Sequence, residues 1–208
     1  MKLWNTYVLP TLVEKACRSH AILEERQRWV PRAEGDILEV GVGTGLNLAF
    51  FDPARARQVT GLDPSRALLA KARPRVATAP VPVALVEGDA AAMPFDRARF
   101  DTVLLTYTLC SVTDPAATLA EIRRVLRPDG ALIFVEHGRA PDPRTYRLQR
   151  WITPAWRRLG GNCHLDRDIG RAIAAAGFTF GELRAGDEGA PPSWISYKYQ
   201  GIARATRT

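Results

Sequence analysis

One short stretch near the start of the chain constrains its fold most strongly. An apolar run over residues 37–40 stops at three alternating glycines, and residues 46–51 are compatible with a helix. The glycines are Gly41, Gly43 and Gly45. Glycine is needed where a backbone turns sharply and a ligand approaches it without Cβ atoms in the way. The pattern predicts a strand, a tight turn and a helix start that offers free N–H groups to a ligand. It is not the dinucleotide pattern G-x-G-x-x-G, because Leu46 stands where the third glycine belongs.

Apolar runs and helix signals alternate along the rest of the chain. Residues 4–30 and the segments after each strand show helical spacing, and Asp114-Pro115 is typical of a helix start. Strands are expected at residues 58–63, 81–86, 100–107, 131–135, 178–183 and 193–203. This alternation of expected strands and helices predicts one α/β domain over residues 1–208. We expect a Rossmann-like, mostly parallel sheet of seven strands with helices on both faces, and a helical cap over residues 1–34.

Polar residues follow the expected strands at the edge where an open α/β sheet binds its ligands. Asp63, followed by Pro64, ends the second strand, so its carboxylate can accept hydrogen bonds from both hydroxyls of a ribose; a surface turn is the alternative. His137 follows the fifth strand and can serve as a general base or as a structural hydrogen-bonding residue. Four residues at the end of the fourth strand are expected near the transferred group or the substrate: Thr106, Tyr107, Leu109 and Cys110. Cys110 also suits a small buried apolar position.

A basic, aromatic segment follows the fifth strand and does not fit the sheet pattern. Residues 139–161 carry six arginines against one acid, interleaved with tyrosine, tryptophan and isoleucine. We expect residues 139–164 to form a lid over the substrate, with Trp151 and Cys163 as substrate contacts. The alternatives are a helix on a membrane surface or a solvated face on which arginine stems cover aromatics. His164, in the loop after the segment, is a second candidate base, and Tyr7 of the helical cap could touch cofactor or substrate.

Charge and cysteine content narrow the partners. The formal charge is +7 and the pI is about 9.8, which suits nucleic acid or an anionic membrane. Zinc-finger spacing and an aromatic-basic RNA signature are both missing from the sequence, which disfavours nucleic acid. The three cysteines, Cys17, Cys110 and Cys163, are too widely spaced to predict a disulfide framework or a zinc site, so no metal is expected. These features indicate a cytoplasmic protein, with peripheral membrane contact left open.

The motifs together resemble a known enzyme family. Glu39, two residues before Gly41, completes the pattern acidic-x-G-x-G-x-G, which resembles motif I of the class I S-adenosylmethionine (SAM) methyltransferases. Asp63, Asp89 and "LRPDG" extend the likeness to the type-11 members over residues 36–136. "YVLP", "TLCSV", "FVEHGRAP", "GGNCHLDRDI" and "YKYQGIAR" resemble the methyltransferase-like protein 7 group, which is similar to alkyl-thiol S-methyltransferases, over nearly the whole chain.

The resemblance implies SAM as cofactor and S-adenosylhomocysteine as product. The glycine turn would pass under the methionine part of SAM with Glu39 near it. Asp89 would meet the adenine amino group and the N–H of Ala90 the ring, although Asp89 also suits a helix cap. The implied cofactor residues are Glu39, Gly41, Gly43, Gly45, Asn47, Asp63, Pro64, Asp89, Ala90 and Thr106.

The expected reaction is methyl transfer to a small-molecule acceptor, and a thiol is favoured. A thiol has a pKa of about 8.5, so a few per cent is already thiolate at neutral pH, and His137 or His164 could raise that fraction. An amine, a phospholipid headgroup, a quinone or a phenol remain alternatives, because fold analogy does not choose an acceptor. A SAM-binding regulatory module without catalysis is the non-enzyme alternative. The oligomeric state is not predicted.

Overall fold

A computed structural model describes residues 20–187 and 192–206, and seven strands form one sheet in it. Along the sheet the order is β3-β2-β1-β4-β5-β7-β6. β1 to β5 pair in parallel, whereas β7 runs antiparallel between β5 and β6. The expected Rossmann-like sheet is confirmed. The strands are β1 (Gly35–Val40), β2 (Ala56–Asp63), β3 (Val83–Glu87), β4 (Phe100–Thr106), β5 (Leu126–His137), β6 (Phe178–Gly186) and β7 (Lys198–Ala205).

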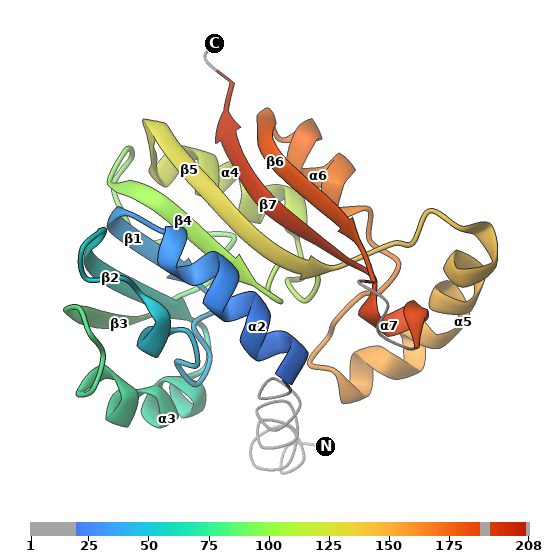
Figure 1. Cartoon of the computed structure of the whole chain (residues 1–208), viewed down its shortest axis with the longest axis horizontal. Coiled ribbons are helices and arrows are strands. Elements are labelled where there is room, and N and C mark those ends of the chain that lie inside the picture. Colours follow the sequence, from blue (N-terminus) through green and yellow to red (C-terminus); the bar gives the residue numbers. More distant parts are fainter. Residues whose placement is uncertain (1–19, 188–191, 207–208) are drawn as a thin grey trace.

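Helices cover both faces of the sheet, as Figure 1 shows, with α2 across the near face and α4 and α6 behind. Each face buries its own core: Leu119 and Ile173 belong to one, Trp29 and Leu69 to the other. The helices are α2 (His20–Trp29), α3 (Arg66–Val76), α4 (Pro115–Val125), α5 (Pro143–Leu159), α6 (Ile169–Ala175) and α7 (Ser193–Ser196), with 3-10 turns η2 (Val30–Arg32) and η3 (Leu48–Phe50). The predicted cap at Asp114 is present, since its side chain accepts the N–H of Ala117.

The order in which successive strands are added to the sheet reverses between β1 and β4. β2 and β3 extend the sheet on one side of β1, and β4 and β5 extend it on the other. In open α/β sheets, ligands bind beyond the carboxyl ends of the strands at such a switch point. The architecture therefore places a ligand site beyond the ends of β1, β2 and β4.

Two element predictions are wrong. Residues 46–51 form a turn and the short η3 rather than an α-helix, because Pro53 forces the chain to become extended within a few residues. Residues 193–203 are not one strand: α7 precedes β7, because the carbonyl of Pro192 accepts N–H bonds from Ile195 and Ser196 and begins a helical turn. β5 begins at Leu126, earlier than the expected residue 131, and residues 128–130 lie within it, next to a shift of register with β4.

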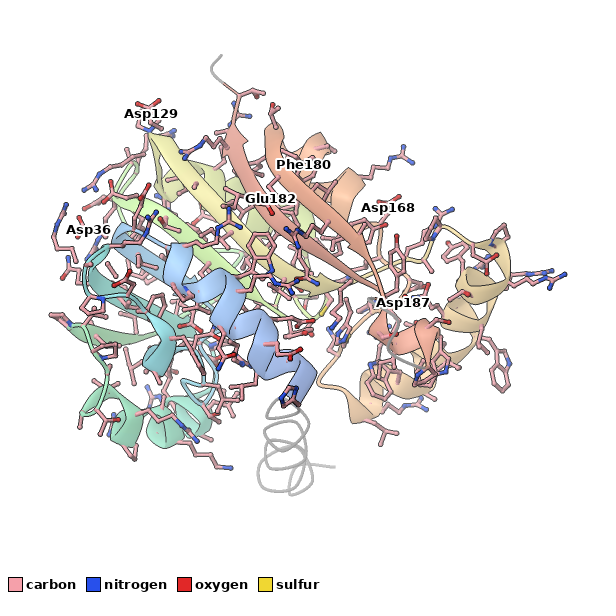
Figure 2. All side chains as sticks on the ribbon, in the orientation of Figure 1. Asp36, Asp129, Asp168, Phe180, Glu182 and Asp187 are labelled. Atoms are coloured by element: carbon pink, nitrogen blue, oxygen red, sulfur yellow. The ribbon has the colours of Figure 1, made fainter. Side chains whose placement is uncertain are left out.

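The described part of the N-terminal cap is bound to β6 and β7. Trp29 Nε1 donates to Gln200 Oε1 at 2.7 Å, and Arg32 pairs with Glu182 of β6 at 2.7 Å (Glu182 is labelled in Figure 2). Lys198 of β7 forms an ion pair with Glu25, and both side chains are almost fully buried. α2 is thereby fixed across the sheet. Residues 1–19, and with them Tyr7, lie outside the described residues.

The basic segment after β5 is helical, and α5 lies beyond the carboxyl end of β5 (Figure 1). Gln149 of α5 is fully buried. Its amide donates to the carbonyls of Gly138 (3.0 Å) and Trp194 (3.1 Å), and its oxygen accepts the N–H of Ala140 at 2.9 Å. α5 is therefore attached both to the end of β5 and to α7. Within residues 20–187 and 192–206, no helix has the length and apolar character to cross a bilayer.

Candidate active site

The glycine turn is hydrogen-bonded to the neighbouring strand β2, and its backbone is accessible at Gly43. The N–H groups of Gly41 and Val42 both donate to the carbonyl of Leu62, at 2.7 and 3.1 Å. Gly43 has φ +55°, in the left-handed region that favours glycine. Among the described residues, a Cβ built at Gly43 would meet nothing closer than the carbonyl oxygen of Gly41, at 3.9 Å. A ligand can therefore approach this backbone closely.

Asp63 joins the end of β2 to the glycine turn. Its carboxylate accepts the N–H of Gly43 at 3.0 Å and the N–H of Ser65 at 2.8 Å. Burial raises the pKa of Asp63, while the two N–H bonds act in the opposite direction. A carboxylate has about four acceptor positions, so two remain for ligand hydroxyls. Pro64 follows directly, and Ser65 caps α3.

A buried polar network lies between the glycine turn, β4 and α2. Asn47 Nδ2 donates to Glu39 Oε1 at 2.8 Å and to Thr106 Oγ1 at 2.9 Å, and the Arg26 guanidinium donates to Asn47 Oδ1. Glu39 and Asn47 are each 1% exposed. Burial raises the pKa of Glu39 to about 7, and the positive charge of Arg26 and the bond from Asn47 limit the rise.

This network has two atoms whose hydrogen bonding is incomplete. Glu39 Oε2 and Arg26 Nε are buried and have no hydrogen-bond partner within the part of the chain that the structure describes. Buried polar atoms are rarely unpaired in folded proteins, so an unpaired acceptor and an unpaired donor of opposite charge indicate a ligand. An amino acid group supplies the complement, because its ammonium suits Glu39 and its carboxylate suits Arg26. The residues present thus fit the methionine part of SAM.

Asp89 lies on the same edge, two residues beyond Glu87, which pairs with Asp63 across β2 and β3. Its Oδ1 accepts the N–H of Ala91 at 2.9 Å and so caps a turn, and no helix lies in the described residues between β3 and β4. Asp89 is exposed and Ala90 is buried. The adenine contacts of Asp89 and Ala90 stay predictions.

A second cluster lies beyond the ends of β4 and β5. Cys110, His137 and Cys163 place one Sγ or ring nitrogen each within 4.8 Å of the others. Cys163 Sγ is 3.6 Å from His137 Nδ1, and the His137 ring lies 4.7 Å from that of Tyr107. The hydrogen bond between the two thiols lowers the pKa of Cys163 to about 5, with His137 adding to the effect, and raises that of Cys110 well above its usual range.

Tyr107 links this cluster to the cofactor residues. It follows Thr106, adopts φ +57° and donates its hydroxyl to Glu25 of α2. A non-glycine residue in the left-handed region at a strand end is costly and is found mainly at functional sites. Tyr107, which follows Thr106 of the network around Glu39 and contacts His137 of the cluster, therefore lies between the two groups of residues.

Two predicted site residues lie outside the cluster. Trp151 is 80% exposed on the outer side of α5, so the prediction that it contacts substrate is wrong for this structure. Trp156, one and a half turns further along, packs against Cys110 and Cys163 instead, together with Trp194 of α7. His164 donates its backbone N–H to the carbonyl of Cys110 at 2.8 Å. Burial, with Arg167 and Arg157 nearby, lowers the pKa of His164.

Comparison with known proteins identifies the family. A family profile described as a methyltransferase domain matches residues 38–134. The protein named thiol S-methyltransferase TMT1B of Rattus norvegicus is 30% identical over 207 residues, covering 93% of this chain and 82% of that protein. The chain belongs to the SAM-dependent methyltransferases. SAM is the methyl donor of this methyltransferase, and the enzyme interpretation of the sequence is confirmed over the regulatory module.

Further relatives of the methyltransferase differ in the acceptor that their names state. Ubiquinone/menaquinone biosynthesis C-methyltransferase UbiE of Roseobacter denitrificans is 36% identical over 153 residues, covering 70% of this chain and 60% of that protein. The crystal structure of an S-adenosylmethionine dependent methyltransferase from Mesorhizobium loti superposes with a TM-score of 0.67 at 18% identity. It covers 89% of this chain and 98% of its own, which confirms the fold.

The assignment of Asp63 to the ribose predicts a large loss of cofactor affinity in Asp63→Asn. An asparagine keeps the shape but loses the charge, and each charge-assisted bond contributes about 1.5–3 kcal/mol. Calorimetry should show SAM binding weakened about a hundredfold or more. The exposed Asp96→Asn variant is the control, and a thermal unfolding scan checks the fold of both. Unchanged affinity in Asp63→Asn would remove the ribose role.

The position of Glu39 predicts a pH dependence of SAM binding. A cofactor ammonium needs the Glu39 carboxylate, whose pKa is about 7 in the free protein. Affinity should therefore fall as the pH decreases through about 7, approaching tenfold per unit below it. Glu39→Gln should bind SAM weakly and lose this part of the profile, whereas the exposed Glu34→Gln should keep it. An equal pH slope in Glu39→Gln and in the native protein contradicts the assignment.

Proposed function

We propose that the methyltransferase transfers the methyl group of SAM to the sulfur of a small thiol. The observation that supports this proposal most directly is the cluster of Cys110, His137 and Cys163 beyond β4 and β5. Tyr107 lies between this cluster and the residues that fit the cofactor. The relative named as a thiol S-methyltransferase, similar over nearly the whole chain, supports the same acceptor.

The protein contributes mainly by positioning donor and acceptor, by excluding water from the acceptor and by favouring ionisation of the acceptor thiol. SAM supplies an electrophilic methyl group when bound. The glycine turn, Asp63, Glu39 and Arg26 hold that donor, and the aromatic side chains of α5 and α7 keep water from the acceptor side. His137 assists ionisation of the acceptor thiol. Little assistance is needed, because a thiol with a pKa of about 8.5 is already partly ionised at neutral pH.

The other acceptors place different demands on the site. An alcohol oxygen needs a stronger base than a histidine, a phenol with a pKa of about 10 needs assisted deprotonation, and the carbon of a quinone ring needs an enolate-like donor. An amine needs only deprotonation. The relative named as a quinone C-methyltransferase and the alternatives of an amine or a phospholipid headgroup therefore belong in one acceptor panel.

Labelled SAM with a panel of thiols, amines, phenols and quinones tests the acceptor. Alkyl and aryl thiols should be the methylated class. His137→Ala should slow a weakly acidic alkyl thiol by about 10²–10⁴, the range of a general base, and an acidic aryl thiol much less. His164→Ala, whose ring lies outside the cluster, is the comparison. Equal losses for both thiols in His137→Ala would assign it a positional role, and methylation of amines or quinones alone would overturn the thiol proposal.

We also propose that α5 brings the enzyme to an anionic membrane surface. Leu148, Trp151 and Leu159 are 40%, 80% and 57% exposed on α5. Arginines at 144, 147, 150, 157 and 158 are exposed on the same helix. A basic helix with exposed Trp and Leu is typical of peripheral membrane binding. Contact here would deliver lipid-soluble acceptors to the edge of the sheet beside α5.

Vesicle sedimentation tests the membrane contact. Binding to vesicles with anionic phospholipid should be strong at low salt and weaken as salt rises, with little binding to zwitterionic vesicles. Trp151→Ser with Leu148→Ser should weaken it at least tenfold, since burying one large apolar side chain is worth roughly 1.5–3 kcal/mol. Leu183→Ser, which removes an exposed leucine from β6, is the matched control. No difference between the two variants would exclude α5 as the contact.

A further inference from the structure

The two cysteines and the histidine beyond β4 and β5 are arranged as metal ligands usually are. Cys110 is fully buried, Cys163 is 5% exposed, and both thiols are free. The three ligand atoms lie within 4.8 Å of one another, although 26 residues separate Cys163 from His137 along the chain. The spacing in the sequence had predicted no such site. It is the sheet that brings these residues together.

We propose that Cys110, His137 and Cys163 form an open three-ligand site for a thiophilic divalent cation, zinc above all, and that its fourth position takes the sulfur of the acceptor thiol. The acceptor part of this proposal rests on the proposed thiol S-methylation; the metal part does not. Two thiolates and one imidazole with an open position are a known ligand set for catalytic zinc.

The separation of the sulfur of Cys163 and the ring nitrogen of His137 suits zinc, and the third ligand atom lies within 4.8 Å of both. Tetrahedral zinc with bonds of about 2.3 Å to sulfur and 2.0–2.1 Å to nitrogen separates those two ligand atoms by about 3.6 Å, and two sulfurs by about 3.8 Å. The observed separation of Cys163 Sγ and His137 Nδ1 is 3.6 Å. No further His, Cys, Asp or Glu joins the three within the described ranges, which leaves a fourth position for a ligand.

The loops that carry the two cysteines are fixed to each other and to the sheet. The Glu136 carboxylate of β5 accepts the N–H groups of Thr108, Leu109 and Cys110 at 2.8–2.9 Å. His164 N–H donates to the carbonyl of Cys110, as described above, and Asn162 Nδ2 donates to the carbonyl of Ser111 at 2.6 Å. Ligands held in this way lose little entropy when a metal binds.

Charge and polarity around the site also favour a metal thiolate. Arg167 donates to the carbonyl of Leu109 at 2.7 Å and interacts electrostatically with both thiols. Zinc with two thiolates is neutral, and the acceptor thiolate makes it singly negative, which Arg167 balances. Leu165, Trp156, Trp194 and Ile195 pack around the cysteines and form the apolar shell that tunes such sites.

The reaction step balances with the groups named. With the metal bound, His137 is a ligand and favours ionisation of the acceptor through the metal, not as a base. The acceptor thiol binds at the fourth position and loses its proton to solvent, because coordination deprotonates a thiol. Its sulfur forms a bond to the methyl carbon of the donor. The bond from that carbon to the sulfonium sulfur breaks, and its electron pair stays on that sulfur. A thioether and S-adenosylhomocysteine result, and one proton is released. The thioether is neutral and leaves the metal readily.

Metal content and a cobalt spectrum test the site without any methyl transfer. The full chain, purified with a phosphine reductant, should bind about one zinc per chain by elemental analysis. Replacement by cobalt should give the visible bands of a tetrahedral site and a thiolate-to-cobalt charge-transfer band. An alkyl thiol added without SAM should change this spectrum, and the alcohol of the same carbon chain should not. A thiol that leaves the spectrum unchanged would overturn the open position.

Variants assign the ligands. Cys163→Ser and His137→Ala should weaken zinc binding by more than the roughly 10–100-fold lost when only a residue behind a ligand is removed. The exposed His20→Ala and the third cysteine, Cys17→Ser, are the matched controls and should retain zinc. If Cys163→Ser fails to fold, the cobalt spectrum of the native chain still decides. Loss of zinc in Cys17→Ser would show a fourth protein ligand and overturn the open site.

The outcomes for the metal and for the thiol acceptor are separable. Chelation that removes zinc should lower alkyl-thiol methylation at least tenfold, and added zinc should restore it. A protein that methylates thiols equally well without metal, or that binds no zinc while both thiols are reduced, overturns the metal proposal and leaves the proposed function standing. A protein that binds one zinc at these residues but methylates no thiol retains the site and loses the proposed function.

Discussion

The parallel pairing of β1, β4 and β5 is the constraint on which the site depends. Parallel strands all end at one edge, so whatever follows each strand is brought to the same place. Here the glycine turn follows β1, Tyr107 and Cys110 follow β4, and His137 ends β5. Donor residues gather on the β1 and β2 side and sulfur ligands on the β4 and β5 side, with Thr106 and Tyr107 between them.

Two buried carboxylates illustrate how one residue type serves two purposes at this edge. Burial raises the pKa of Glu39 and of Glu136 to about 7 in each case. Glu136 has three backbone N–H partners and fixes the loop that carries Cys110. Glu39 has one oxygen without a partner among the described residues. The Glu136 carboxylate, with its partners in place, shapes the backbone, whereas the Glu39 carboxylate has an acceptor oxygen left over for a ligand.

The sequence predicted the sheet, its helices and the positions of Glu39 and Asp63, because these depend on local patterns of apolar residues, glycines and strand ends. It did not identify Arg26 or Glu25 as site residues. Several charged residues lie close together in this helix, and their spacing does not show which of them point toward the protein interior. It also missed the meeting of Cys110 with Cys163. That contact depends on where residues 160–165 return to the sheet, which spacing along the chain does not encode. Trp151 and Trp156 differ only in helical phase, and only packing showed which one faces inward.

β7 is antiparallel to β5 and β6, and this direction decides which elements lie at the acceptor side. β7 begins at the edge where the parallel strands end. The last part of the chain therefore brings Trp194 of α7 and Lys198 of β7 to the acceptor side. The family profile ends at residue 134, before α5 and α7. The glycine turn, Asp63 and Cys110 therefore lie within the matched profile, whereas the aromatic side chains of α5 and α7 that pack against Cys110 and Cys163 come from elements outside it.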